Sequence, residues 1–138
     1  MATILIIDDE KSIRKTLAEI LTYEGYNIDE ASDGEEGLKK FKEKTFDLVL
    51  CDIKMPKLDG IEFLEKAKEI NSDVPVIIIS GHGNIETAVD AVKKGAFDYI
   101  SKPPDLNRML ITLRNAMDKN NLVAETRVLK RKLARYRR

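Results

Sequence analysis

The chain has 138 residues, of which 43% are hydrophobic and 35% charged, and its formal net charge is zero. This length suits one domain with its own core. No apolar run approaches about 18 residues, so we expect no membrane-spanning segment. The single cysteine, Cys51, excludes an internal disulfide and fits a cytoplasmic protein.

Five short segments have the composition of β-strands. Three of them are apolar at successive positions rather than at alternating ones, which is typical of strands buried on both faces of a parallel sheet. These three are Ile4–Ile7, Leu48–Cys51 and Val76–Ile79, and the two weaker candidates are Asn27–Ala31 and Phe97–Ile100.

A helical pattern follows each of these segments. Apolar residues recur there at spacings of three and four, as on one face of a helix, and Asp33 and Asp105 stand where N-caps are expected. The stripes are formed by Ile13, Leu17, Ile20 and Leu21; by Leu38 and Phe41; by Ile61, Leu64 and Ala67; by Ile85, Ala88, Val89 and Val92; and by Leu106, Met109, Leu110 and Leu113.

Strands that alternate with helices predict the fold class. We expect a doubly wound α/β fold, (βα)5 in form, with a five-stranded parallel sheet, right-handed crossovers and helices on both faces. The flavodoxin-like strand order 2-1-3-4-5 is the natural arrangement for five such units.

Polar residues stand at the ends of four predicted strands. Asp8 and Asp9 follow the first strand, Asp52 the third, Ser80 the fourth, and Lys102 comes just after the fifth. The carboxyl ends of parallel strands form the ligand-binding edge of such sheets, so these residues should converge. Each one alone would be explained as a helix cap, a loop hydroxyl or a solvated charge, and their joint occurrence indicates a site.

Carboxylates gathered at one edge need a cation. Two like charges ~4 Å apart repel by roughly 4 kcal/mol at an effective dielectric constant of ~20. Oxygen ligands without a His/Cys cluster favour Mg²⁺, with Mn²⁺ as the alternative. A carboxylate nucleophile, a metal ion, a lysine and a hydroxyl donor suffice for phosphoryl transfer, which depends mainly on positioning and charge stabilisation.

Together these motifs resemble the receiver domain of bacterial two-component response regulators. The resemblance covers about residues 3–118, and its segments are Ile4–Glu10, Asp47–Pro56 with Asp59-Gly60, Pro75–Ser80 and Gly95–Pro103. The stretch Ser80–Val89 is similar to the NtrC/NtrX-type subgroup, in which a sigma-54-activating ATPase and a DNA-binding domain follow the receiver. That subgroup usually has Phe after Lys-Pro, where this chain has Pro104.

The resemblance implies a chemical role for each residue of the site. Asp52 would be the phosphoacceptor, phosphorylated by a sensor histidine kinase, and Lys102 its counter-charge. Asp9 would bind Mg²⁺ directly and Asp8 largely through water. The backbone carbonyl of Lys54 would complete the protein ligands.

The resemblance also implies how the signal leaves the site. Ser80 would follow the phosphoryl group and Tyr99 would turn inward, which switches the face made by the fourth helix, fifth strand and fifth helix. The chain would then be a phosphoacceptor signalling domain rather than an enzyme. Its effector, a sigma-54-type transcriptional activator, would lie outside the chain. A cis Lys102–Pro103 bond is expected as well.

One alternative is a Mg²⁺-dependent phosphohydrolase with an aspartyl nucleophile. Such enzymes usually carry a second acid two residues after the nucleophile, where this chain has Lys54. Turnover of a small phosphate ester would favour the enzyme, whereas a single stoichiometric phosphorylation would favour the receiver.

The tail over 119–138 differs from the rest of the chain. It carries eight Lys or Arg and one acid, whereas residues 1–118 carry 16 Lys or Arg and 23 Asp or Glu. We therefore divide the chain into a domain over 1–118 and a basic linker helix over 119–138 that continues the fifth helix.

The tail also has an apolar stripe at alternating spacings of four and three. With Thr126, the stripe is formed by Leu122, Leu129, Leu133 and Tyr136. This spacing predicts a short coiled coil that promotes a homodimer. A solvated helical extension and a nucleic-acid-binding segment are the alternatives.

Overall fold

The computed structural model describes residues 2–81 and 85–118, and its centre is a parallel sheet. The strand order is β2-β1-β3-β4-β5, so the predicted order 2-1-3-4-5 is confirmed. The strands are β1 (Thr3–Ile7), β2 (Asn27–Ala31), β3 (Leu48–Asp52), β4 (Val76–Ser80) and β5 (Asp98–Ser101). The helices are α1 (Lys11–Tyr23), α2 (Gly34–Glu43), α3 (Gly60–Ile70) and α4 (Ile85–Lys93), followed by a helix over 106–118.

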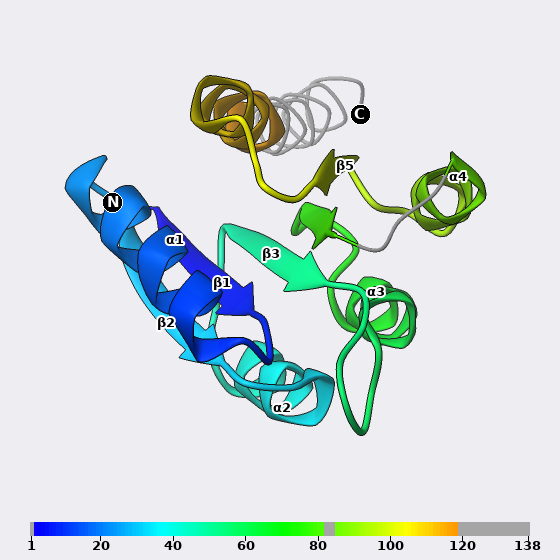
Figure 1. Cartoon of the computed structure of the whole chain (residues 1–138). Helices are drawn as coiled ribbons and strands as arrows, with labels where there is room; N and C mark the ends of the chain where they lie inside the picture. The colour runs from blue at the N-terminus through cyan, green and yellow to red at the C-terminus, as the bar shows by residue number, and fades with distance from the viewer. Residues whose placement is uncertain (1, 82–84, 119–138) are drawn as a thin grey trace, which may run out of the picture.

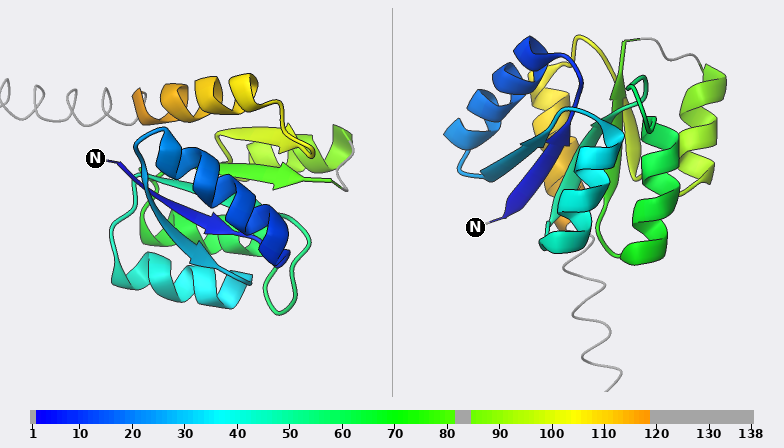
Figure 2. Two further views of the ribbon diagram at one scale, coloured as in Figure 1. Left: turned by 60° about the vertical axis from the view of Figure 1, so that its left-hand side comes forward. Right: turned by 90° about the horizontal axis from the view of Figure 1, so that it is seen from below.

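The helices cover both faces of the sheet, as predicted for a doubly wound fold (Figures 1 and 2). Helix α1 and the 106–118 helix pack on one face, while α2, α3 and α4 pack on the other. Alternate residues of each central strand enter the two cores. In β1, for example, Leu5 and Ile7 belong to the core under α2 and α3, and Ile4 and Ile6 to the core under α1.

The predicted strand boundaries are close to the observed ones. Strand β3 extends to Asp52 and β4 to Ser80, so both polar residues are the last residues of their strands. Strand β5 begins at Asp98, one residue later than predicted. Phe97 lies just before it and already donates its amide to the Val76 carbonyl, 2.8 Å away.

Helix α4 presents its larger apolar residues to solvent. Ile85, Val89 and Val92 are 83%, 46% and 51% exposed, whereas Ala91 is fully buried against the core. The periodic stripe therefore marked a helix correctly, but within Ile85–Lys93 the residue that enters the core is Ala91, which was not part of the stripe. An apolar surface remains uncovered there.

The edge strand β2 is held by ion pairs from the helices on both sides. Lys40 and Lys44 lie 3.0 and 2.9 Å from the carboxylate of Asp29. Burial opposes ionisation of Asp29, but the hydrogen bonds from Lys44 and Lys40 outweigh it and lower the pKa of Asp29 to about 2. The next residue, Glu30, pairs with Arg14 of α1 at 3.1 Å.

The predicted linker helix and its seam of Leu122, Leu129, Leu133 and Tyr136 lie outside the described residues. Within 2–81 and 85–118, no helix has both the length and the apolar character needed to cross a membrane.

Gly60 brings the start of α3 against the end of β3. Its amide donates to the Ile53 carbonyl at 2.8 Å. A Cβ at this position would lie well inside van der Waals contact of the Asp52 carbonyl oxygen, and 2.9 Å from Ile53 Cα. The absence of a side chain therefore fixes how closely α3 approaches the backbone of Asp52.

Gly60→Ala should destabilise the fold, although alanine is the better helix former. The added methyl group meets backbone atoms that cannot move aside, so we expect the free energy of unfolding to fall by about 1–3 kcal/mol. Urea denaturation measures this change. The matched control is Gly81→Ala, whose Cβ would meet no atom of the described residues closer than 3.6 Å. Equal effects of the two substitutions would contradict the steric explanation.

Candidate functional site

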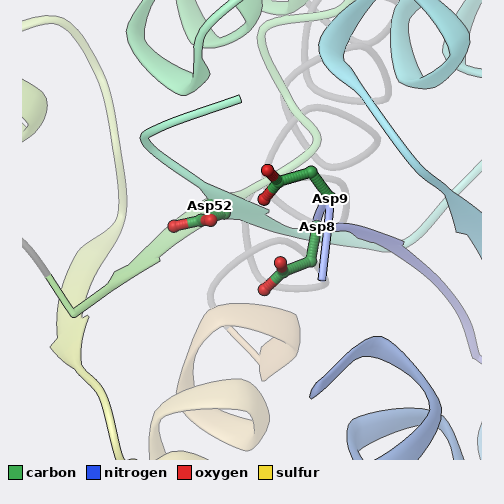
Figure 3. Close-up of side chains that lie close together, drawn as sticks. All are labelled: Asp8, Asp9 and Asp52. Carbon is green, nitrogen blue, oxygen red and sulfur yellow. The ribbon is translucent and has the colours of Figure 1, made fainter. Parts of the chain in front are cut away.

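Three carboxylates meet at the carboxyl edge of the sheet (Figure 3). Asp8 and Asp9 directly follow β1, and Asp52 ends β3. One oxygen from each lies within 4.8 Å of the others. Asp8 and Asp52 are 1% and 3% exposed, whereas Asp9 is open to solvent. The three carboxylates therefore converge as predicted.

Lys102 is the cation that faces two of these carboxylates. Its Nζ lies 2.7 Å from Asp8 Oδ2 and 3.5 Å from Asp52 Oδ2, and the side chain is 12% exposed. Burial opposes its charge, but the hydrogen bond to Asp8 and the charges of Asp8 and Asp52 raise its pKa above the ordinary lysine value. Lys102 is therefore protonated at neutral pH. The Lys102–Pro103 bond is cis, as expected.

Asp52 is held in an environment that resists its ionisation. Burial and the neighbouring charge of Asp8 raise its pKa, while Lys102 and a 2.9 Å hydrogen bond from the Ile53 amide act in the opposite direction. The net direction is upward. A further positive charge at this edge would therefore favour the carboxylate form of Asp52.

A cation fits this donor set. The three carboxylates provide only hard oxygen atoms, and Lys102 balances one of their charges. Oxygen donors of this kind suit Mg²⁺ or Mn²⁺ better than the softer metals that prefer sulfur or imidazole. Beside Asp9, the loop after β3 forms a cavity of about 520 Å³ that includes Lys54 in its lining.

The two predicted switch residues lie on neighbouring strands. Ser80, which ends β4, is 2% exposed and is the register partner of Ser101 on the neighbouring strand β5. Tyr99 is half-buried and packs against the core on the α4 side. Its hydroxyl is buried without a hydrogen-bond partner in the described parts of the chain. The ring therefore already occupies an inward position here.

Cys51 lies directly beneath the site. It is fully buried, and its thiol donates to the Asp52 carbonyl at 3.3 Å. Burial, followed by the charges of Asp52 and Asp8, raises the pKa of this thiol well above its usual value. Cys51 therefore serves packing rather than chemistry.

One residue of the site, Arg14, was not predicted from the sequence. Its guanidinium lies behind the acidic loop and donates from Nη1 to the Asp8 carbonyl at 2.7 Å. An arginine in the first turns of a helix carries no signal of its own. Its role becomes visible only once the pairing of β1 with β2 places Glu30 beside it.

Comparison with known proteins agrees with this geometry. Residues 4–114 match the family model of the response regulator receiver domain. Over 114 residues the chain is 43% identical to the transcriptional regulatory protein ZraR of Klebsiella oxytoca. That alignment covers 83% of this chain but only 26% of ZraR. The chain thus spans about a quarter of the length of this relative.

Solved structures give the same result. The crystal structure of NtrX from Brucella abortus in complex with ADP is similar, with a TM-score of 0.88 and 38% identity over 93% of this chain and 30% of that one. The solution structure of the beryllofluoride-activated NtrC4 receiver domain dimer has a TM-score of 0.83 and 42% identity, over 87% of this chain and 99% of that one. The chain therefore belongs to the response regulator receiver domain family, with the receivers of ZraR and NtrX among its relatives.

Proposed function

We propose that Asp52 is the phosphoacceptor of a two-component phosphorelay. The observation that carries this proposal is the placement of Asp52: a buried carboxylate within 4.8 Å of the Asp8 and Asp9 ligand atoms and 3.5 Å from the Lys102 ammonium. Asp8 shares this burial and these neighbours, but Lys102 already engages its Oδ2 at 2.7 Å, whereas the Oδ2 of Asp52 lies 3.5 Å from the ammonium. The phosphodonor is a sensor histidine kinase, and the protein acts in the cytoplasm.

The transfer needs little covalent chemistry from the protein. An Asp52 oxygen attacks the phosphorus, and an O–P bond forms as the P–N bond to the kinase histidine breaks. The histidine leaves with the bonding electron pair and takes up a proton. Lys102 neutralises a phosphoryl oxygen, and Ser80 donates a hydrogen bond to another. Preorganised charge of this kind is the main source of rate enhancement in phosphoryl transfer.

Asp9, Asp52 and the Lys54 carbonyl would bind Mg²⁺ directly, and Asp8 would act mainly through water. When bound, the ion would neutralise the carboxylates and the incoming phosphoryl oxygens. The donor set supports this role, because three acids face a single lysine among the described residues of the site.

The alternative, a phosphohydrolase, is less well supported. The position two residues after Asp52 is Lys54, which is exposed, so the second acid typical of such enzymes is missing there. The domain would instead assist only its own phosphorylation and dephosphorylation.

The output is proposed to pass through Ser80 and Tyr99 to α4, β5 and the 106–118 helix. Moving an equilibrium from 1:99 to 99:1 requires about 5.5 kcal/mol of differential stabilisation. One charge-assisted hydrogen bond contributes about 1.5–3 kcal/mol, so Ser80 alone is not sufficient and Lys102 and the cation must contribute. The buried, unpartnered Tyr99 hydroxyl supports this route, because a new partner for it would stabilise one state over the other.

The switched state is proposed to dimerise and to control a downstream sigma-54-type activator. The exposed stripe of Ile85, Val89 and Val92 on α4 supports this proposal, because it is an apolar surface that nothing in the described chain covers. The NtrC4 receiver, a relative, is a dimer when activated by beryllofluoride. The basic tail, with its seam from Leu122 to Tyr136, is proposed to extend this contact.

Asp52→Asn should abolish phosphorylation, because the amide cannot act as the nucleophile. With acetyl phosphate and Mg²⁺, mass spectrometry should find one phosphoryl group on the wild-type chain and none on the variant. Asp59→Asn is the matched control: Asp59 caps α3 by accepting from the Glu62 amide at 2.8 Å, and asparagine caps equally well. Full labelling of Asp52→Asn would disprove the assignment.

Asp9→Ala should weaken Mg²⁺ binding and slow phosphorylation strongly, because a ligand and its charge are lost. Isothermal titration with MgCl₂ and labelling rates at fixed acetyl phosphate measure the two effects. Asp73, an acid far along the chain on the loop before β4, provides the control Asp73→Ala. If Asp9→Ala bound Mg²⁺ like the wild type, the proposed metal centre would be wrong.

Beryllofluoride should convert the wild-type chain from monomer to dimer in sedimentation velocity. Ser80→Ala should bind beryllofluoride yet dimerise less, because the hydrogen bond proposed from the Ser80 hydroxyl to the bound group is missing. Val89→Asp should bind it and remain monomeric, because it places a charge in the apolar surface. Truncation to 1–118 should weaken the dimer.

The control for the apolar surface is Tyr23→Asp. Tyr23 is 90% exposed but lies on α1, on the other face of the sheet. If the dimer formed in Val89→Asp but not in Tyr23→Asp, the contact would lie on the face of α1 and the proposal for α4 would be wrong.

A further inference from the structure

Asp8 is held at every polar group it has. Its amide donates to the Ala31 carbonyl at 3.1 Å, and its Oδ1 accepts from the Glu10 amide at 2.9 Å. Its Oδ2 accepts from Lys102 at 2.7 Å. The remaining group, the backbone carbonyl, accepts from Arg14 Nη1 at 2.7 Å. Arg14 therefore fixes the one part of Asp8 that the acidic site itself does not hold.

Arg14 is in turn fixed by β2. Its side chain is 12% exposed, and its Nε lies 3.1 Å from Glu30 Oε1. The planar guanidinium thus donates to Glu30 and to the Asp8 carbonyl with different nitrogens, which a single ammonium group cannot do with the same geometry. The pair forms a brace between the sheet edge and the loop that carries the acids.

The carbonyl that Arg14 holds belongs to the peptide between Asp8 and Asp9. Its orientation sets the direction in which the Asp9 side chain leaves the backbone. The Asp9 carboxylate is exposed and has no hydrogen-bond partner of its own within the described segments, so nothing else in them aims it at the other two acids. Groups behind the direct ligands commonly determine metal affinity in this way.

We propose that Arg14, braced by Glu30, is a positioning residue that orients Asp9 for Mg²⁺ binding. This inference rests on the proposed metal centre. It makes a prediction opposite to the one that charge alone would make. If Arg14 acted only as a nearby positive charge, its removal would raise the affinity for Mg²⁺. If it orients the peptide, its removal lowers that affinity.

The test measures Mg²⁺ dissociation constants of the full chain by isothermal titration. Arg14→Gln should weaken binding by about tenfold, the size of effect seen when groups that orient metal ligands are removed. Arg14→Lys keeps the charge but loses the planar guanidinium that donates to two partners, so its Mg²⁺ affinity should lie between those of the wild type and Arg14→Gln. Because Arg14→Lys also keeps most of the side-chain stem, it remains informative if Arg14→Gln folds poorly.

The matched control is Lys15→Gln. Lys15 is the next residue of α1 and pairs with the same Glu30 at 2.9 Å, but it is 55% exposed and its ammonium is bound to Glu30 rather than to Asp8. Lys15→Gln removes one positive charge beside the Arg14–Glu30 pair without changing the hydrogen bond to Asp8. We expect its Mg²⁺ affinity to equal that of the wild type or to be slightly higher. Urea denaturation in EDTA separates all these effects from folding.

A second measurement separates positioning from general damage. The rate of labelling by acetyl phosphate in Arg14→Gln should need a higher Mg²⁺ concentration to reach half its maximum, while the maximum itself stays near the wild-type rate. Mg²⁺ affinity of Arg14→Gln equal to or above that of Lys15→Gln would overturn the inference and leave the metal centre standing. A wild-type chain that does not bind Mg²⁺ would overturn both.

Discussion

Like charge crowded at one edge of the sheet is the constraint on which this molecule depends. Asp8 and Asp52 are almost fully buried, and a single ammonium, that of Lys102, lies between them. Such an arrangement is unfavourable without a compensating cation. The fold therefore maintains a site that gains stability when positive charge arrives, and this property is what a phosphoryl-accepting, metal-binding edge requires.

The backbone around the site explains how this crowding is tolerated. Strands β1 and β3 are apolar from Ile4 to Ile7 and from Leu48 to Cys51, and the two cores that these residues enter hold the acids in place from below. Gly60 lets α3 approach the Asp52 backbone, and Arg14 holds the loop after β1. The site is thus closely packed on the side of β1 and β3. On the other side, Ser80 and Tyr99 lie on β4 and β5, and α4 packs against β5 with Ala91 as its buried residue.

The sequence predicted the sheet and the converging residues because both follow from local rules. Apolar runs such as Ile4–Ile7 identify buried strands, and the rule that parallel strands end at one edge brings Asp8, Asp52 and Lys102 together without knowledge of their distances. Arg14 could not be found in this way, because its role depends on a partner sixteen residues away on an edge strand.

The outward face of α4 shows another limit of the sequence. Periodicity tells that Ile85, Val89 and Val92 share one side of a helix, but it does not tell whether that side faces the sheet or solvent. Ala91 packs in the core, but a residue this small does not stand out from its neighbours in a hydrophobic pattern. Which side of a helix is covered is decided by packing against distant strands, not by the helix itself.

The reactivity of the buried thiol beneath Asp52 can report how often the backbone of this chain opens. Cys51 is the single cysteine, it is fully buried, and its raised pKa keeps it protonated. An alkylating reagent can reach it only when β3 separates from its neighbours, so the alkylation rate counts those opening events. A cation that neutralises the carboxylates above β3 would stabilise the closed sheet and slow the alkylation of Cys51. The change in alkylation rate would therefore measure the coupling between the acidic edge and the centre of the sheet without an added label.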